Sequence, residues 1–72
     1  MPTVHIGLLG AGNIAADHAR SLRLNPLVGK LSVFDVDPAR AGQFAQTHQA
    51  ELAATEAELI DRCDLVWICT PP

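Results

Sequence analysis

Residues 4–15 read Val-His-Ile-Gly-Leu-Leu-Gly-Ala-Gly-Asn-Ile-Ala, an apolar run that ends in a glycine-rich turn. The turn has the spacing Gly10-x-Gly12-x-x-Ala15, which is a dinucleotide-binding fingerprint when it joins a strand to a helix. Gly10 permits a sharp exit from the strand, Gly12 lets a pyrophosphate approach the backbone, and Ala15 lets the helix pack closely on the strand. The stretch therefore predicts a strand, a phosphate-binding turn and the start of a helix.

Strands and helices alternate along the whole chain. The sequence predicts strands at 4–9, 31–36, 51–53 and 64–69, and helices at 13–24, 38–48 and 56–62. Strands that are apolar on both faces and joined by helices form a parallel sheet covered on both sides. The predicted fold is therefore α/β, a Rossmann-like doubly wound parallel sheet, and right-handed crossovers favour the strand order 3-2-1-4.

Helical spacing and capping residues support these helices. The first helix is expected to place Ile14, Ala15, Ala19 and Leu22 toward one side, and the second to face Ala41, Phe44 and Ala45 inward. Asp37 followed by Pro38 is typical of a helix start, and Thr55 with Glu58 fits a capping box.

Seventy-two residues make one small domain at most. A doubly wound sheet usually has six strands, and only about four are predicted here. We therefore expect residues 1–72 to be the N-terminal part of a dinucleotide-binding domain, from a longer protein or a truncated form. The last predicted strand would lie at an edge of the sheet, long and apolar, so an oligomer is expected to bury it.

Charge and composition exclude several classes of partner. The net charge of −3 gives no indication of nucleic acid or an anionic membrane as a partner. The sequence has no apolar run of 18 residues and no charged region typical of a signal peptide, so we expect a cytoplasmic protein. Cys63 and Cys69 have no zinc-site spacing and are interpreted as structural thiols. No histidine pair has metal-ligand spacing, and no residue of the chain is predicted to be catalytic.

The N–H groups of Asn13 and Ile14, at the start of the first helix, are the predicted phosphate donors. Asp35 lies 20 residues after Ala15 (35 − 15) at the predicted end of the second strand, where a carboxylate can accept hydrogen bonds from the adenosine ribose. Its charge would repel a 2′-phosphate, which favours NAD over NADP. Arg40 could reach such a phosphate, but is interpreted as a solvated surface charge.

Thr70 and Pro71 come directly after the last predicted strand. Ligands of open parallel sheets bind beyond the carboxyl ends of the strands, at the point where the strand order reverses, so these two residues are predicted to line the cofactor. Each predicted site residue also has a purely structural interpretation: a glycine turn that binds nothing, a carboxylate at a strand end, and a rigid Thr-Pro-Pro exit.

Taken together, these stretches resemble the N-terminal part of the glucose–fructose oxidoreductase/inositol dehydrogenase family, also written Gfo/Idh/MocA. The matching segments are 6–15 with His18, 33–41 with its Asp-Val-Asp-Pro, and 63–72 with its Cys-Thr-Pro-Pro. The family often has glycine where Gln49 ends the second helix here. The resemblance covers essentially all 72 residues.

The resemblance implies the NAD(P)-binding portion of an oxidoreductase that moves a hydride to or from a sugar, polyol or related carbonyl substrate. The family's acid–base residues and substrate domain lie beyond the position of Pro72, so none is carried over to this chain. A nucleotide-sensing Rossmann module without catalysis is the alternative, and a folding unit with no ligand is a third. The sequence of a chain continuing beyond Pro72 would discriminate the first two.

Overall fold

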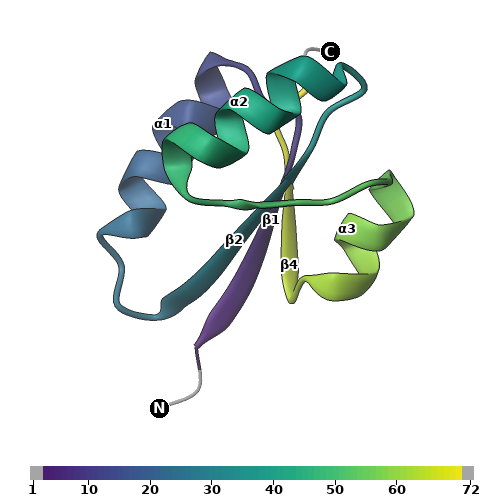
Figure 1. Cartoon of the computed structure of the whole chain (residues 1–72). Coiled ribbons are helices and arrows are strands. Elements are labelled where there is room, and N and C mark those ends of the chain that lie inside the picture. The colour runs from purple at the N-terminus through teal and green to yellow at the C-terminus, as the bar shows by residue number, and fades with distance from the viewer. Residues whose placement is uncertain (1–2, 71–72) are drawn as a thin grey trace.

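A computed structural model describes residues 3–70 of the chain. One sheet contains four strands, β1 (Val4–Leu9), β2 (Val28–Phe34), β3 (Glu51–Leu52) and β4 (Leu65–Ile68). The helices between them are α1 (Asn13–Arg23), α2 (Pro38–His48) and α3 (Glu56–Arg62). The strands pair in parallel in the order β3-β2-β1-β4, which confirms the predicted doubly wound fold and its strand order (Figure 1).

The helices cover the two faces of the sheet unequally. Figure 1 shows α1 and α2 together on one side of the sheet and α3 on the other. Ile6 and Leu8 of β1 point to the first side and belong to the main core, together with Ala15, Ala19, Leu22, Leu31, Val33 and Phe44. Gly7 points to the opposite side, where a Cβ on this residue would lie 3.1 Å from Cδ1 of the fully buried Leu59 in α3.

The second strand departs most from its predicted bounds. The sequence predicts it at 31–36, and it spans Val28–Phe34. It begins earlier because Val4 pairs with Val28, and the register then shifts so that His5 pairs with Lys30. It ends earlier because the Asp35 side chain accepts the backbone N–H of Asp37, which starts a turn. The last strand, predicted at 64–69, is shorter for a related reason: the Asp64 carboxylate accepts the N–H of His5.

The prediction that Ile14 shares one side of α1 with Ala15, Ala19 and Leu22 is wrong, since 61% of this residue is exposed and the other three are buried. Ala15, Ala19 and Leu22 form the buried stripe of α1 as predicted. Ile14 lies in the first turn of α1, outside this stripe, and lines a hollow at the glycine turn. Both predicted N-caps are confirmed: Asp37 accepts from the N–H of Ala39, and Thr55 accepts from the N–H of Glu58. The Glu58 carboxylate, predicted to complete a capping box, pairs with Arg62 instead.

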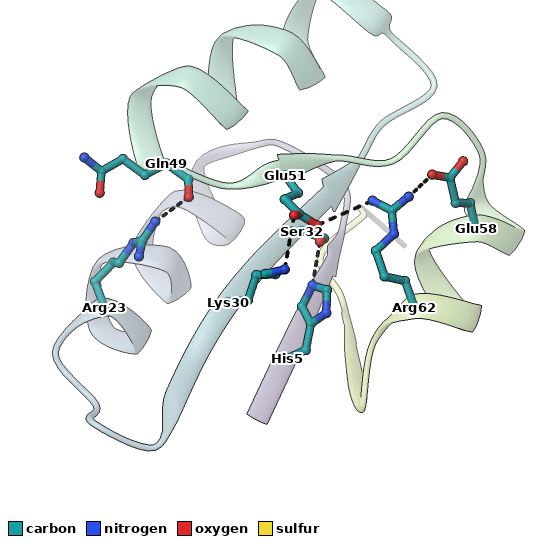
Figure 2. A network of polar contacts seen from close by, with 8 residues as sticks. All are labelled: His5, Arg23, Lys30, Ser32, Gln49, Glu51, Glu58 and Arg62. Carbon is teal, nitrogen blue, oxygen red and sulfur yellow. Dashed lines mark hydrogen bonds and ion pairs between the residues drawn. The ribbon is translucent and has the colours of Figure 1, made fainter. Parts of the chain in front are cut away.

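Ion pairs tie the short strand β3 to its neighbours (Figure 2). Glu51 lies 3.3 Å from Nζ of Lys30 and 3.6 Å from Nη1 of Arg62, which also pairs with Glu58. Beneath them, Nε2 of His5 lies 2.7 Å from Oγ of the fully buried Ser32, so this polar core residue has a hydrogen-bond partner. The ion pairs are half-exposed and stabilise the fold only modestly.

The outer edge of β4 is unpaired in the described part of the chain. Leu65 and Ile68 are largely exposed there, and Trp67 contacts the ring of His18 edge-on with 4.6 Å between centroids. That an oligomer would bury this edge stays a prediction. The longest helix within residues 3–70 has 11 residues, too few to cross a membrane.

The end of α2 depends on a residue in the left-handed conformation. Gln49 has φ 56°, and the guanidinium of Arg23 donates hydrogen bonds to the carbonyl oxygens of His48 and Gln49 (Figure 2). A side chain in this conformation costs about 1 kcal/mol relative to glycine.

Replacing Gln49 by glycine should therefore raise the free energy of unfolding by about 1 kcal/mol. Gln43→Gly, in the exposed middle of the same helix, is the matched control and should lower it by about the same amount, because glycine is a poor helix former. Urea denaturation of both variants measures the two changes. Destabilisation by Gln49→Gly would contradict the assignment.

Candidate functional site

The glycine-rich turn between β1 and α1 meets the ends of β2 and β4 at the carboxyl edge of the sheet. The N–H of Gly10 donates to the carbonyl of Phe34 at 2.7 Å. Gly10 has φ 110°, and a Cβ on it would lie 3.1 Å from the backbone of Cys69 and Thr70. Glycine is thus required at position 10 by the turn and by the close approach of β4.

Gly12 has no such internal reason to be glycine. Its φ of −91° is open to any residue, and no atom lies within 4 Å of where its Cβ would be. Gly12 is also the N-cap of α1, which receives no side-chain cap, whereas Asp37 and Thr55 cap the other two helices. The start of α1 therefore has open space and N–H groups directed along the helix axis, which suits an anion.

Asp35 joins the glycine turn to the end of β2. Its Oδ2 accepts the N–H of Ala11 at 2.8 Å, and its Oδ1 accepts the N–H of Asp37 at 2.9 Å. The N–H of Asp37, partly opposed by burial, lowers the pKa of the Asp35 carboxyl, with further lowering from the N–H of Ala11 and the charge of Arg40. Asp35 is therefore an anion at neutral pH, and each oxygen keeps a free lone pair.

Two adjoining hollows lie at this edge. The inner hollow, of about 350 Å³, runs along the glycine turn and the start of α1, and Asn13 and Ile14 line it. The outer hollow, of about 370 Å³, lies beside the end of β2, and its walls include Val36 and Glu56. Four residues line both hollows: Gly10, Asp35, Arg40 and Thr70. Together the hollows form one continuous surface from α1 past Asp35 to α3.

The structure brings six of the seven predicted site residues together around these hollows, namely Gly10, Gly12, Asn13, Ile14, Asp35 and Thr70. Pro71, the seventh, lies outside the described residues. The exposure of Ile14 is consistent with a place at the hollow rather than in the core.

Two charged residues that line these hollows, Arg40 and Glu56, are not among the predicted site residues. The sequence alone indicates a solvated charge at Arg40, and the structure shows Arg40 lining both hollows beside Asp35. The sequence indicates only a helix start at Glu56, which lines the outer hollow. The sequence does contain a signal for Arg40: it lies one turn after the Asp37 cap, which places it near Asp35 at the end of β2. Glu56 lines this hollow because the chain leaves the edge strand β3 at the carboxyl edge and enters α3, which leads across the sheet to β4.

Neither cysteine has the character of a nucleophile. Burial raises the pKa of the Cys63 thiol and that of the Cys69 thiol, so both are neutral near pH 7. Both are free cysteines. Within residues 3–70, no group of three His, Cys, Asp or Glu side chains is arranged to hold a metal ion.

Comparison with known proteins decides which family uses this arrangement. The family model described as the oxidoreductase family with an NAD-binding Rossmann fold, GFO_IDH_MocA, matches residues 4–72. The chain belongs to this family. The resemblance drawn from the glycine turn, Asp-Val-Asp-Pro and Cys-Thr-Pro-Pro is thereby confirmed, and membership favours the oxidoreductase interpretation over the nucleotide-sensing module.

Individual relatives agree with the family. Inositol 2-dehydrogenase of Rhizobium meliloti strain 1021 is 39% identical over 70 residues, covering 96% of this chain and 21% of the relative. The crystal structure of a putative myo-inositol dehydrogenase from Sinorhizobium meliloti 1021 has a TM-score of 0.81 at 38% identity, covering 96% of this chain and 21% of that one.

A second solved structure is that of GenD2 from gentamicin A biosynthesis in complex with NAD. Its TM-score is 0.87 at 25% identity, covering 99% of this chain and 21% of that chain. The chain thus spans about a fifth of the length of the relatives that it matches.

The lowered pKa of Asp35 predicts a specific acid sensitivity. A folded-state pKa below the unfolded value means that ionised Asp35 stabilises the fold above its ordinary pKa of 3.8, and that this is lost as pH falls through the folded-state pKa. Asp35→Asn, which cannot accept at both atoms, should lower the free energy of unfolding by about 1 kcal/mol at pH 7.

The same variant should lose stability less steeply than the original chain between about pH 5 and pH 2. Urea midpoints of both proteins over this range measure the difference. Two parallel pH profiles would show that the Asp35 carboxylate is not held by the backbone N–H groups as described.

Proposed function

We propose that this chain is the N-terminal part of a dinucleotide-binding domain and binds a nicotinamide adenine dinucleotide along the two hollows. The observation that carries the proposal is the open space at Gly12 above the uncapped start of α1. The pyrophosphate would lie against Gly12, with the N–H groups of Asn13 and Ile14 as donors. Gly10 would shape the turn beneath it.

Asp35 would hold the adenosine ribose. Its two oxygens each accept one backbone N–H, which fixes the carboxylate at the shared wall of the hollows. The remaining lone pairs can accept from two vicinal hydroxyl groups. Thr70 lines both hollows, and with Pro71 would flank the cofactor from the side of β4.

The larger proposal is an oxidoreductase that moves a hydride between the nicotinamide cofactor and a sugar, polyol or related carbonyl compound in the cytoplasm. An inositol 2-dehydrogenase among the relatives and an NAD complex among the similar structures support it. The bound nicotinamide would supply the hydride chemistry, and residues of this chain would bind and orient the cofactor. Residues 1–72 contribute no catalytic group to the proposal.

Gly12→Ser tests the proposed binding while preserving the fold. A serine at this N-cap can accept a helix N–H, so the free energy of unfolding should stay within about 1 kcal/mol of the original value. The side chain would fill the space and occupy the N–H groups required by the pyrophosphate. Calorimetric titration with NADH should therefore show binding weakened by at least about tenfold.

Gly42→Ser is the matched control, because Gly42 also has open space at its Cβ position but lies within α2 and lines neither hollow. It should bind NADH like the original chain. Equal NADH binding by both serine variants, or no NADH binding by the folded original chain, would refute the proposal.

The charge of Asp35 predicts a preference between cofactors. A 2′-phosphate adds about −1.5 to −2 charges beside an ionised carboxylate, and the single positive charge of Arg40 offsets only part of this repulsion. NADH should bind about tenfold or more tightly than NADPH. In Asp35→Asn the ratio of NADH affinity to NADPH affinity should become smaller. A less ordered glycine turn would weaken the binding of both cofactors alike and would leave this ratio unchanged. Tighter binding of NADPH by the original chain would contradict the assignment.

A further inference from the structure

The outer hollow extends beyond the groups that the phosphates and ribose would use. It is lined by the apolar side chains of Leu9, Phe34 and Val36, and 91% of Val36 is exposed at its mouth. Such a surface suits a flat aromatic ring, whose faces are apolar and whose edge carries the polar atoms. These three apolar side chains supply no acceptor for such an edge.

Glu56, the first residue of α3, supplies an acceptor at this place. It lines the outer hollow and not the hollow at the glycine turn, whereas Asp35 lines both. The order along the surface is therefore the start of α1, then Asp35, then Glu56. A dinucleotide has the same order in its adenosine half: phosphate, ribose, base.

The carboxylate of Glu56 is not occupied by the fold. The nearby Glu51 pairs with Lys30 and Arg62, and Glu58 pairs with Arg62. Among residues 3–70, no ion pair or side-chain hydrogen bond includes Glu56, which is exposed. An ionised carboxylate is an acceptor only, so its partner in the hollow must present N–H or O–H groups.

We propose that Glu56 is a specificity-determining residue that recognises the base, its carboxylate accepting a hydrogen bond from the exocyclic amine at C6 of adenine. This proposal rests on the dinucleotide function proposed above. Adenine presents that amine as a donor on its polar edge. A base without a donor on this edge would leave the carboxylate unpaired at the wall of the hollow, at a cost in affinity.

The test compares NAD⁺ with its 1,N⁶-etheno derivative, in which a fused ring removes the donor from this edge. Both ligands carry the same phosphates, riboses and nicotinamide. Calorimetric titration of the original chain should show NAD⁺ binding at least about tenfold more tightly. Glu56→Ala should reduce this ratio several-fold, because the variant has lost the acceptor that distinguishes the two bases, while any steric cost of the added ring remains in both proteins.

Asp61→Ala is the matched control, since Asp61 is an exposed acid on the same helix that lines neither hollow. It removes the same charge and should keep the ratio of the original chain. Glu56→Gln keeps a neutral acceptor and should give an intermediate ratio. A merely structural role of Glu56 at the start of α3 would not change the ratio between the two ligands.

The outcomes separate the two proposals. An unchanged ratio in Glu56→Ala, with NAD⁺ still bound, would overturn base recognition by Glu56 and leave the proposed function in place. Failure of the folded original chain to bind NAD⁺ would overturn the proposed function and base recognition with it. Circular dichroism of each variant establishes that it is folded.

Discussion

The carboxylate of Asp35 is the constraint on which the site depends, because it binds two parts of the backbone that are far apart in sequence. One oxygen holds the N–H of Ala11 in the glycine turn, and the other holds the N–H of Asp37 at the start of α2. The turn is thereby fixed against the end of β2, and the start of α1 is directed at the inner hollow. An ionised acceptor is well suited to this task, since hydrogen bonds to charged groups are the stronger ones.

Glycine has different physical meanings at the two positions of the fingerprint. Gly10 is required by the protein itself, through its positive φ and the backbone of β4 at 3.1 Å. No contact within the described chain requires glycine at position 12, and the open space there is where we propose that the pyrophosphate lies. The comparison shows that the fold requires glycine at position 10 and leaves space at position 12, a difference that the spacing Gly-x-Gly alone does not reveal.

Local signals in the sequence predict most of the fold. Apolar runs indicate the strands, the caps at Asp37 and Thr55 indicate two helix starts, and the right-handed crossover rule favours the observed strand order. Strand ends are less predictable. Pairing with β1 extends β2 back to Val28, although Gly29 and Lys30 do not continue the apolar pattern that indicates a strand. Most of the site is predictable because its residues lie just after strand ends. The place of Glu56 at the site is not predictable from the sequence, because it depends on where the connection from β3 to β4 crosses the sheet.

The most direct measurement is a titration of the ¹⁵N-labelled chain with NAD⁺, monitored through the backbone amide signals in NMR spectra. We expect large, saturable shifts at Gly12, Asn13 and Ile14, with the amide of Ala11 protected from exchange before any ligand is added. Saturable shifts confined to other parts of the chain, or a rapidly exchanging Ala11 amide in the folded protein, would contradict this expectation.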